Sequence, residues 1–215
     1  MSPEGDAAAT AEARRLFDVQ QAASRTGPAP TLAVRLGRLE RLRSLVFDEQ
    51  EAFARAISDD FGGRSPAETK LLEIVPTLSA IRFARKHLSR WMKPQRRRID
   101  PAFQPGKAWV RHEPLGVIGI ISPWNYPLQL AISPLVDAIA AGNRAMLKPS
   151  ELTPGFSALL HRLIAERFEE AEIAVVTGGP EVGQTFSTLP FDHLLFTGST
   201  AIGRKVYQAA AGTSA

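Results

Sequence analysis

A short apolar run in the middle of the chain restricts the possible folds most strongly. Val117-Ile118-Gly119-Ile120-Ile121 is continuously apolar and rich in β-branched residues. Runs of this kind form strands that are buried on both faces of a parallel sheet. Parallel strands need long crossover connections, which are usually helices. The run therefore predicts an α/β protein in which helices cover both faces of a sheet.

The chain beyond this run alternates between short apolar stretches and helical patterns. Further strands are predicted at residues 145–148, 173–176 and 193–196, and an alternating segment at 108–112 also reads as a strand. Helices are predicted at residues 127–141, 154–167, 182–189 and 199–211. Units of this kind fold with right-handed crossovers into a doubly wound sheet. The expected fold is an incomplete Rossmann-like doubly wound parallel sheet, preceded by N-terminal helices.

The first hundred residues have a helical pattern instead. Residues 1–9 are small and polar and are expected to form a disordered tail. Helices are predicted at residues 10–24, from residue 31 to about 46, at 49–61 and at 65–91. Ser65, Pro66 and Glu68 suit the first turn of the last of these helices. The expected domains are a helical part over residues 10–100 and a partial α/β part over residues 101–215.

A basic run between Lys86 and Arg98 accounts for much of the pI of about 9.8, although the net charge is only +4. One interpretation is binding to nucleic acid or to an anionic membrane. The other is a solvated helix end followed by a basic connector, stopped by Pro94. No stacking aromatic platform or groove-reading motif accompanies the charges, which favours the connector and predicts no nucleic-acid partner.

Neither a secretory signal nor a membrane span is predicted. Glu4 and Asp6 lie in an N-terminus without an apolar segment. The most apolar stretch, residues 128–147, is interrupted by Pro134, Asp137 and Asn143. The sequence therefore predicts a soluble protein of the cytoplasm.

Ligands of doubly wound sheets bind at the carboxyl ends of the strands. Four loops meet that edge in the predicted fold, at residues 122–127, 149–153, 177–183 and 197–203. In the last of them, Gly198 and Gly203 hold the outer positions of a dinucleotide-binding fingerprint, with Thr200 in place of its middle glycine. The turn could cradle a pyrophosphate at a helix N-terminus, or serve only the packing of helix on strand.

Lys148 and Glu151 follow directly after a predicted buried strand. The lysine could hydrogen-bond a ribose or phosphate, and the glutamate could accept from a ribose hydroxyl and repel a 2′-phosphate. The alternative is a Ser150 cap with Glu151 in the first turn of the next helix.

Trp124 and Asn125 lie between two prolines in the loop after the central strand. An asparagine can donate a side-chain N–H to a developing oxyanion. The alternative is that Asn125 caps the following helix and Trp124 packs against the protein.

Three segments taken together resemble the aldehyde dehydrogenase superfamily. They are Ile-Ser-Pro-Trp-Asn-Tyr-Pro, Met-Leu-Lys-Pro-Ser-Glu and Phe-Thr-Gly-Ser-Thr, in this order, and the resemblance extends from about Leu36 to Ala211. Phe191-Asp192-His193 resembles the class 3-like branch. Segments at residues 60–65, 87–94 and 175–180 look like those of bacterial coniferyl aldehyde dehydrogenases.

The resemblance implies a role for each matching residue. Asn125 matches the catalytic asparagine that stabilises the oxyanion. Lys148 and Glu151 match the pair that holds the adenosine ribose, and the middle-position Thr200 is usual in this family. The implied cofactor-binding residues are Ser122, Trp124, Lys148, Glu151, Gly179, Gly183, Gly198, Ser199 and Gly203. The implied cofactor is NAD, with NADP possible, the substrate is a small aldehyde such as coniferyl aldehyde, and full-length relatives are expected to be homodimers.

The sequence departs from the family in its catalytic groups. Family chemistry needs a cysteine nucleophile and a general-base glutamate, and this chain of 215 residues has no cysteine. The segment that carries the glutamate is expected soon after Ala211, where the chain reads Gly212-Thr213-Ser214-Ala215. We therefore expect a chain truncated before the catalytic residues, without a catalytic domain and inactive alone. The alternative is a non-catalytic nucleotide-binding or interaction module.

Overall fold

A computed structural model of the protein describes residues 3–212 and contains the predicted parallel sheet. Its strands are β3 (Val117–Ile121), β4 (Arg144–Lys148), β5 (Ile173–Val175) and β6 (His193–Phe196), in the order β5-β4-β3-β6. All three pairings are parallel, with Ile118 opposite both Ala145 and His193. The predicted α/β class is confirmed.

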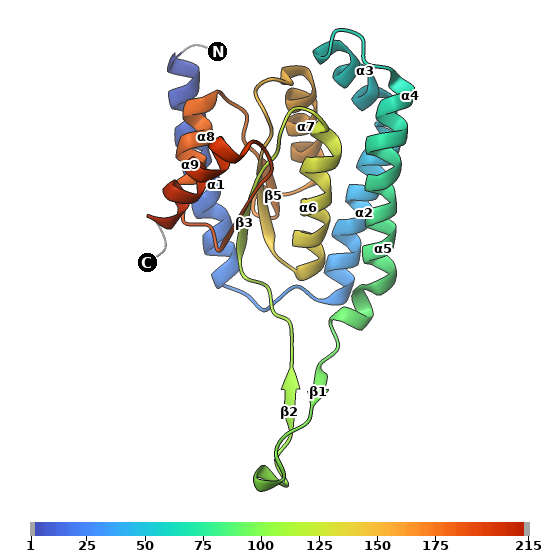
Figure 1. Ribbon diagram of the computed structural model, residues 1–215, viewed down its shortest axis with the longest axis vertical. Helices are drawn as coiled ribbons and strands as arrows, with labels where there is room; N and C mark the ends of the chain where they lie inside the picture. The colour runs from blue at the N-terminus through green and yellow to red at the C-terminus, as the bar shows by residue number, and fades with distance from the viewer. Residues whose placement is uncertain (1–2, 213–215) are drawn as a thin grey trace.

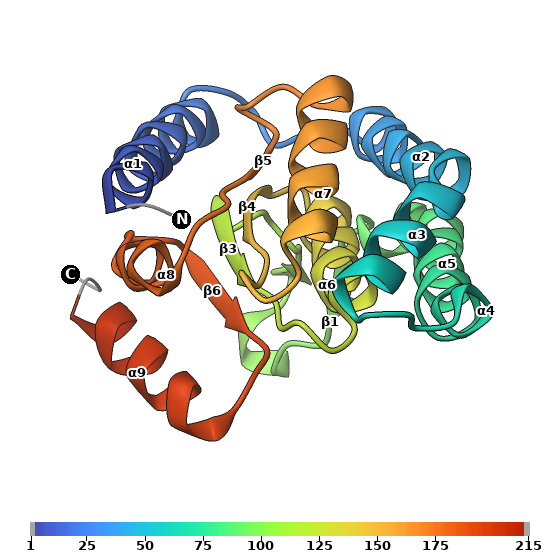
Figure 2. The same cartoon turned by 90° about the horizontal axis from the view of Figure 1, so that it is seen from above.

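Helices cover both faces of this sheet, as Figure 2 shows. The connections α6 (Pro127–Ala141) and α7 (Pro154–Arg167) lie on one face. On the other face lie α1 (Pro3–Arg25) and α8 (Pro180–Ser187), which pack against each other. The last helix, α9 (Thr200–Ala211), packs beside β6 and α8. The sheet is therefore doubly wound.

Alternate residues of the strands supply two separate cores. Ile118 and Ile120 of β3 face a large core shared with α6, α7 and an outer layer of three helices. That layer consists of α2 (Leu32–Asp48), α3 (Gln50–Asp60) and α5 (Val75–Trp91). Val117 of β3 and Met146 of β4 face a smaller core formed with α1 and α8. This two-sided burial is the reason that β3 has no polar position.

The helical segment predicted as one unit over residues 65–91 has an internal irregularity. It consists of α4 (Pro66–Thr69), one π-helical turn η1 (Lys70–Ile74) and α5. The wide turn is closed by the N–H of Val75, which donates to the carbonyl of Lys70. Pro76 follows immediately and has no N–H to donate to the preceding turn. We attribute the wide turn to this proline, and π-turns of this kind are frequent at functional sites.

The first helix begins earlier than the sequence predicts. α1 starts at Pro3 instead of Thr10, so the expected disordered tail is wrong for residues 3–9, while residues 1 and 2 lie outside the described part. Proline suits a first helical turn, and the Ala7-Ala8-Ala9 run has high helix propensity. Farther along, the buried Gln20 donates its side-chain amide to the carbonyls of Ala145 and Glu170, at 3.0 and 2.9 Å.

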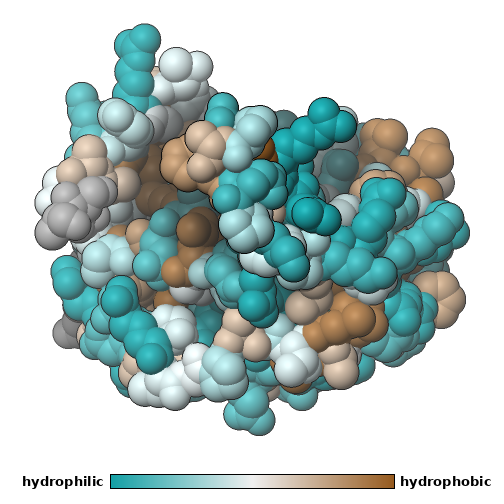
Figure 3. All heavy atoms as spheres, turned by 90° about the horizontal axis from the view of Figure 1, so that it is seen from below, coloured by the Kyte–Doolittle hydropathy of each residue, from teal (hydrophilic) through white to brown (hydrophobic). Residues whose placement is uncertain are grey.

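A hairpin extends away from the body of the protein (Figure 1). It consists of β1 (Gln95–Arg97) and β2 (Ala108–Val110), paired antiparallel, with the short η2 helix (Pro101–Phe103) between them. The basic connector of the sequence analysis therefore contains a strand, whose three residues are all exposed. Seen from the hairpin end, the surface is largely hydrophilic with separate apolar patches (Figure 3). No helix among residues 3–212 is long and apolar enough to cross a membrane.

Gly142 ends α6 in a conformation that other residues rarely adopt. Its φ is +89°, and an added Cβ would lie 2.5 Å from the guanidinium carbon of Arg35. That buried arginine donates to the carbonyls of Pro30 and Ala140, at 2.9 and 3.0 Å. Gly142→Ala is expected to lower the free energy of unfolding by about 2 kcal/mol, because the backbone is strained and Arg35 must move.

Urea denaturation of both variants measures this effect against a matched control. Gly37→Ala places the same methyl group inside α2, where a Cβ meets nothing within 4 Å. The control is expected to leave stability unchanged or to raise it by about 0.5–1 kcal/mol. Equal effects of the two substitutions would show that neither the backbone conformation of Gly142 nor its contact with Arg35 matters for stability.

Candidate functional site

The chain direction in the sheet marks one crevice as the expected ligand site. From β3 the chain runs outward to β4 and β5 by way of α6 and α7, and then returns by way of α8 to β6 on the other side of β3. The strand order therefore reverses between β3 and β6. Open α/β sheets bind ligands at this switch point, outside the carboxyl ends of the strands. All four predicted loops lie at this edge, onto which Figure 2 looks.

Lys148 ends β4 with its amine buried. Its Nζ donates to the carbonyl of Pro149 at 2.9 Å and lies 3.6 Å from the carboxylate of Glu151. Burial lowers the pKa of Lys148, while the charge of Glu151 acts in the opposite direction. Glu151 itself is exposed. A buried amine beside an exposed carboxylate is suited to a ligand that carries neighbouring hydroxyl groups.

The alternative interpretation of this segment does not match the structure. Ser150 does not cap α7, because its Oγ accepts the N–H of Leu152 at 3.2 Å within the preceding turn. The N–H groups of Gly155 and Phe156 in the first turn of α7 donate instead to the carboxylate of Asp60, at 2.9 and 2.8 Å. Lys148 and Glu151 are therefore not explained by helix capping.

Ser122 connects the β3 loop to Lys148. Its backbone N–H donates to the carbonyl of Lys148 at 3.2 Å, and its side chain is buried. Its hydroxyl has no hydrogen-bond partner within residues 3–212. An unsatisfied buried hydroxyl is costly and uncommon, so its position beside Lys148 fits a site that a polar ligand completes.

Asn125 is exposed at the end of the loop after β3. Its Oδ1 accepts the N–H of Tyr126 at 3.1 Å, and its backbone carbonyl accepts from Arg64 at 3.0 Å. Among the described residues the amide nitrogen has no hydrogen-bond partner, and Asn125 does not cap α6. The neighbouring Trp124 is 49% exposed and lies against Phe61, with ring centroids 5.8 Å apart. The asparagine amide is therefore available as a donor.

Glu73 of the π-helical turn caps α6, which the alternative interpretation had assigned to Asn125. Its buried carboxylate accepts the N–H groups of Leu128 and Gln129 at the start of α6, at 2.8 and 3.2 Å. The other carboxylate oxygen lies 3.0 Å from Arg64, which also holds the Asn125 carbonyl. Neither Arg64 nor Glu73 is among the residues predicted from the sequence. A glutamate one residue before the buried Ile74 was the available signal, since acidic residues are rarely fully buried unless they are paired.

The glycine turn after β6 packs on an aromatic ring. A Cβ at Gly198 or Gly203 would lie 2.5 or 3.2 Å from the ring of Phe196. Ser199 caps α9, with its Oγ 3.4 Å from the N–H of Ile202. The packing interpretation of this turn is therefore supported. The turn also lines a shallow cavity of about 450 Å³ together with Arg204, which leaves room for an anion at the helix N-terminus.

The two glycines of the β5 loop differ in their surroundings. Gly179 is the N-cap of α8 and donates its N–H to the carboxylate of Asp6 at 3.1 Å. A Cβ at Gly183 would meet nothing within 4 Å. Close packing within this chain therefore explains Gly179 but not Gly183.

The predicted residues form two groups along one edge. Lys148 contacts both Ser122 and Glu151, whereas Asn125 has no hydrogen bond to another predicted residue among those described. No group of acidic, histidine or cysteine side chains that could hold a metal ion occurs in residues 3–212. The edge therefore offers a buried amine, an exposed amide and a helix N-terminus, which suits an elongated polar ligand.

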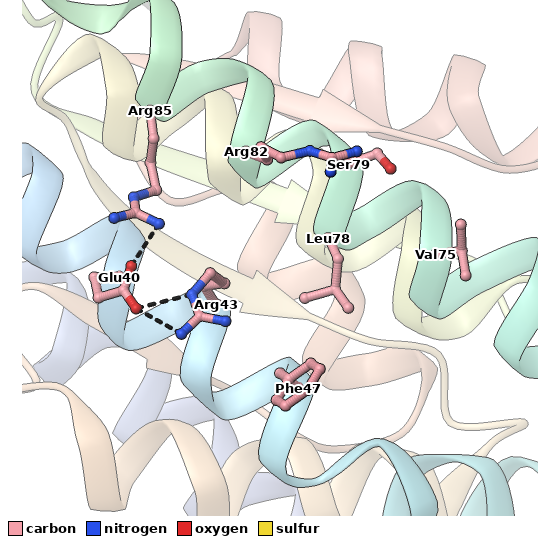
Figure 4. A pocket seen from close by; sticks show the side chains of 8 residues that line it. All are labelled: Glu40, Arg43, Phe47, Val75, Leu78, Ser79, Arg82 and Arg85. Atoms are coloured by element: carbon pink, nitrogen blue, oxygen red, sulfur yellow. Dashed lines mark hydrogen bonds and ion pairs between the residues drawn. The ribbon is translucent and has the colours of Figure 1, made fainter.

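A larger groove lies elsewhere, between α2 and α5 (Figure 4). It has a volume of about 570 Å³, and Phe47, Val75 and Leu78 provide its apolar lining. At one end, Glu40 pairs with Arg43 and Arg85 at 2.7 and 2.6 Å, as the dashed lines show. The groove is far from the strand ends in the fold and contains none of the predicted site residues, so we do not place the chemistry there.

Comparison with known proteins places this architecture in a known family. The sequence model of a family described as "Aldehyde dehydrogenase family" matches residues 4–215. The chain is 52% identical over 196 residues to a probable coniferyl aldehyde dehydrogenase of Pseudomonas aeruginosa, covering 91% of this chain and 41% of the relative. It is 49% identical to a coniferyl aldehyde dehydrogenase of a Pseudomonas species, covering 86% and 38%.

Solved structures agree with the sequence comparison. The structure described as a substrate-bound state of Staphylococcus aureus AldH matches with a TM-score of 0.89 and 37% identity, over 93% of this chain and 43% of that one. An NAD⁺ complex of an aldehyde dehydrogenase from Bacillus cereus matches with a TM-score of 0.82 and 28% identity, over 95% and 42%. The chain thus spans about two fifths of the length of these relatives.

Proposed function

The chain belongs to the aldehyde dehydrogenase family, and we propose from this premise that it carries the dinucleotide-binding part of an NAD-dependent enzyme that oxidises an aldehyde to a carboxylic acid. The single observation that supports this most is the buried Lys148 beside Glu151 at the carboxyl edge of a doubly wound sheet. The unsatisfied Ser122 hydroxyl next to this pair fits the same ligand.

In this proposal each residue of the edge has one task. The Lys148 amine and the Glu151 carboxylate bind the hydroxyl groups of the adenosine ribose. The α9 N-terminus, with Gly198, Ser199 and Gly203, holds the pyrophosphate, since helix N-termini favour anions. Gly179 and Gly183 border the adenine, and Trp124 lines the cleft. NAD supplies the hydride acceptor when it is bound.

Asn125 is proposed to act on the substrate. Its side-chain amide donates a hydrogen bond to the aldehyde oxygen, on which negative charge develops when a nucleophile attacks the carbonyl carbon. A carboxamide does not titrate, so this donor is available at every working pH. Arg64 holds the backbone carbonyl of the same residue at 3.0 Å and limits the movement of the loop.

The remaining assignments are also proposals. The likeness to coniferyl aldehyde dehydrogenases supports an aromatic aldehyde such as coniferyl aldehyde as the substrate. We also propose a cytoplasmic protein that forms homodimers and binds neither nucleic acid nor membrane, as the family resemblance of the sequence implies. A non-catalytic nucleotide-binding module is the second candidate, favoured by the absence of cysteine from the 215 residues, which leaves them without the thiol nucleophile of this chemistry.

Calorimetry and a hydride-transfer assay on the 215-residue chain test the two parts of this proposal. Titration with NAD is expected to show binding at one site, with a rise in the melting temperature that grows with NAD concentration. Addition of coniferyl aldehyde to the NAD-bound chain is expected to produce no NADH, because no thiol is present. Absence of NAD binding would refute the site, and NADH formation that depends on the aldehyde would refute the need for a cysteine.

A further inference from the structure

The first turns of α1 reach the proposed adenosine end of the site. Asp6 lies in the second turn of this helix and is half-buried. Its carboxylate accepts the N–H of Gly179 at 3.1 Å, across 173 residues of sequence. Figure 2 shows α1 beside α8 on the same face of the sheet. A charged side chain from the start of the protein thus borders the loop after β5.

This carboxylate occupies a position that suits an anion. Gly179 is the N-cap of α8, where the free N–H groups and the helix dipole favour negative charge. A Cβ on Gly179 would lie 2.9 Å from the Asp6 carboxylate, so the glycine lets the acid approach closely. An internal carboxylate therefore takes the place at the α8 N-terminus that a phosphate group could otherwise use.

Asp6 also adds to the negative charge around Lys148. The charge of Asp6 tends to raise the pKa of the Lys148 amine, as does the charge of Glu151 3.6 Å away. The negative charges of two carboxylates therefore offset the positive charge of the buried Lys148 amine. A ligand hydroxyl can be accommodated there, whereas a second phosphate would be repelled.

We propose that Asp6 selects against dinucleotides that carry a phosphate on the adenosine ribose, by occupying the α8 N-terminus with a fixed negative charge. The inference rests on the proposed binding of the adenosine ribose by Lys148 and Glu151. It assigns a specificity-determining role to α1, beyond the contribution of Glu151. NAD then binds without a charge penalty, and NADP places its 2′-phosphate near two carboxylates.

Substitution of Asp6 by asparagine isolates the charge. The variant Asp6→Asn keeps an oxygen that can accept the Gly179 N–H but removes the negative charge. Calorimetric titration is expected to show that Asp6→Asn binds NADP about tenfold more tightly than the unmodified chain does, with NAD affinity unchanged. The gain should shrink as salt is added, because salt screens the exposed part of the interaction.

Two further variants control for folding and for net charge. Asp18→Asn removes the same charge from an exposed position on the same helix and is expected to change neither affinity. Asp6→Glu retains the charge and is expected to retain the preference for NAD. Thermal unfolding of each variant shows whether α1 remains docked.

The outcomes separate this inference from the function on which it rests. If NAD binds but Asp6→Asn improves NADP binding no more than Asp18→Asn does, the role of Asp6 is refuted and the dinucleotide site stands. If neither dinucleotide binds to the unmodified chain or to any variant, the proposed function is refuted and this inference with it. A loss of preference in Asp6→Glu would also overturn the assignment to charge.

Discussion

Replacement of Glu73 by alanine is expected to lower the free energy of unfolding by about 3–5 kcal/mol, the usual cost of removing one partner from a buried ion pair. The carboxylate is fully buried and is 3.0 Å from Arg64, whose side chain is only 7% exposed. Without the Glu73 carboxylate, the positive charge of Arg64 remains buried and loses its buried negative partner. The N–H groups of Leu128 and Gln129 also lose their acceptor. Urea denaturation followed by circular dichroism measures the loss.

Two other variants test the physical origin of this effect. Glu73→Gln keeps an acceptor oxygen of the same shape and is expected to cost less than Glu73→Ala. Glu68→Gln removes the exposed partner of Arg64, 3.4 Å away, and is expected to cost less than about 1 kcal/mol. If Glu73→Ala were no more harmful than Glu68→Gln, the buried pair would not stabilise this region.

The pH dependence of the Glu73 contribution has a definite sign. Desolvation by burial raises the pKa of Glu73 above 4.5, although the N–H of Gln129 and the charge of Arg64 oppose the shift. The folded protein therefore holds a proton at this carboxyl more tightly than the unfolded chain does. The corresponding stability is fully present below the unfolded pKa and is lost as pH rises through the folded pKa. Glu73→Gln should lack this loss.

Replacement of Lys148 by methionine is expected to weaken NAD binding by about 10–100-fold, since a hydrogen bond to a charged group contributes about 1.5–3 kcal/mol. Lys148 is the only lysine with a buried side chain among residues 3–212, so no neighbouring lysine replaces it in the proposed site. The same substitution is expected to raise stability by about 1 kcal/mol at neutral pH, because a buried charge gives way to an apolar side chain of similar length. Calorimetry and thermal unfolding measure the two effects.

The contribution of Lys148 to stability should change with pH in the direction opposite to that of Glu73. Burial lowers the pKa of Lys148 below 10.5, so the unfolded chain binds the proton more tightly. The stability of the unmodified chain therefore rises with pH between the folded pKa and 10.5, and the advantage of Lys148→Met shrinks over that range.

An exposed lysine provides the control for both effects of Lys148→Met. Lys86→Met changes a lysine on α5 and should alter neither binding nor the pH profile. Equal effects of the two substitutions would contradict the role assigned to Lys148.

Elements with strong local signals could be predicted to the residue. β3, α6, α7 and β6 have the predicted bounds, because apolar runs, prolines at helix starts and Gly142 after α6 mark them. β1 was missed because its residues are charged and exposed and their strand state depends on pairing with β2. The early start of α1 was missed although Pro3 and the Ala7-Ala8-Ala9 run are local helix signals, and its contact between Asp6 and Gly179 forms only in the folded protein.

The candidate site shows the same division. Lys148, Glu151 and Asn125 could be proposed from the sequence because each follows directly after a recognisable strand or lies within a distinctive loop. Arg64 and Glu73 were not, because their importance comes from their contacts with each other and with the β3 loop and the start of α6, and Glu73 lies in a π-helical turn. A pattern of one sequence contains no signal for a contact of this kind, except that a glutamate lies beside buried positions of a helix.

The docking of α1 has a consequence for the order in which the protein can assemble. Gln20 bonds to the carbonyls of Ala145 and Glu170, so this helix cannot take its final place until the chain beyond residue 170 exists. At about 5–20 residues per second, synthesis of the chain from the end of α1 to residue 170 takes on the order of ten seconds. Until then the apolar side of α1, with Leu16 and Phe17, lacks the part of its core that Ala174, Val182 and Phe186 supply. The first helix to be made is thus among the last to be buried, and contacts of such long range slow folding.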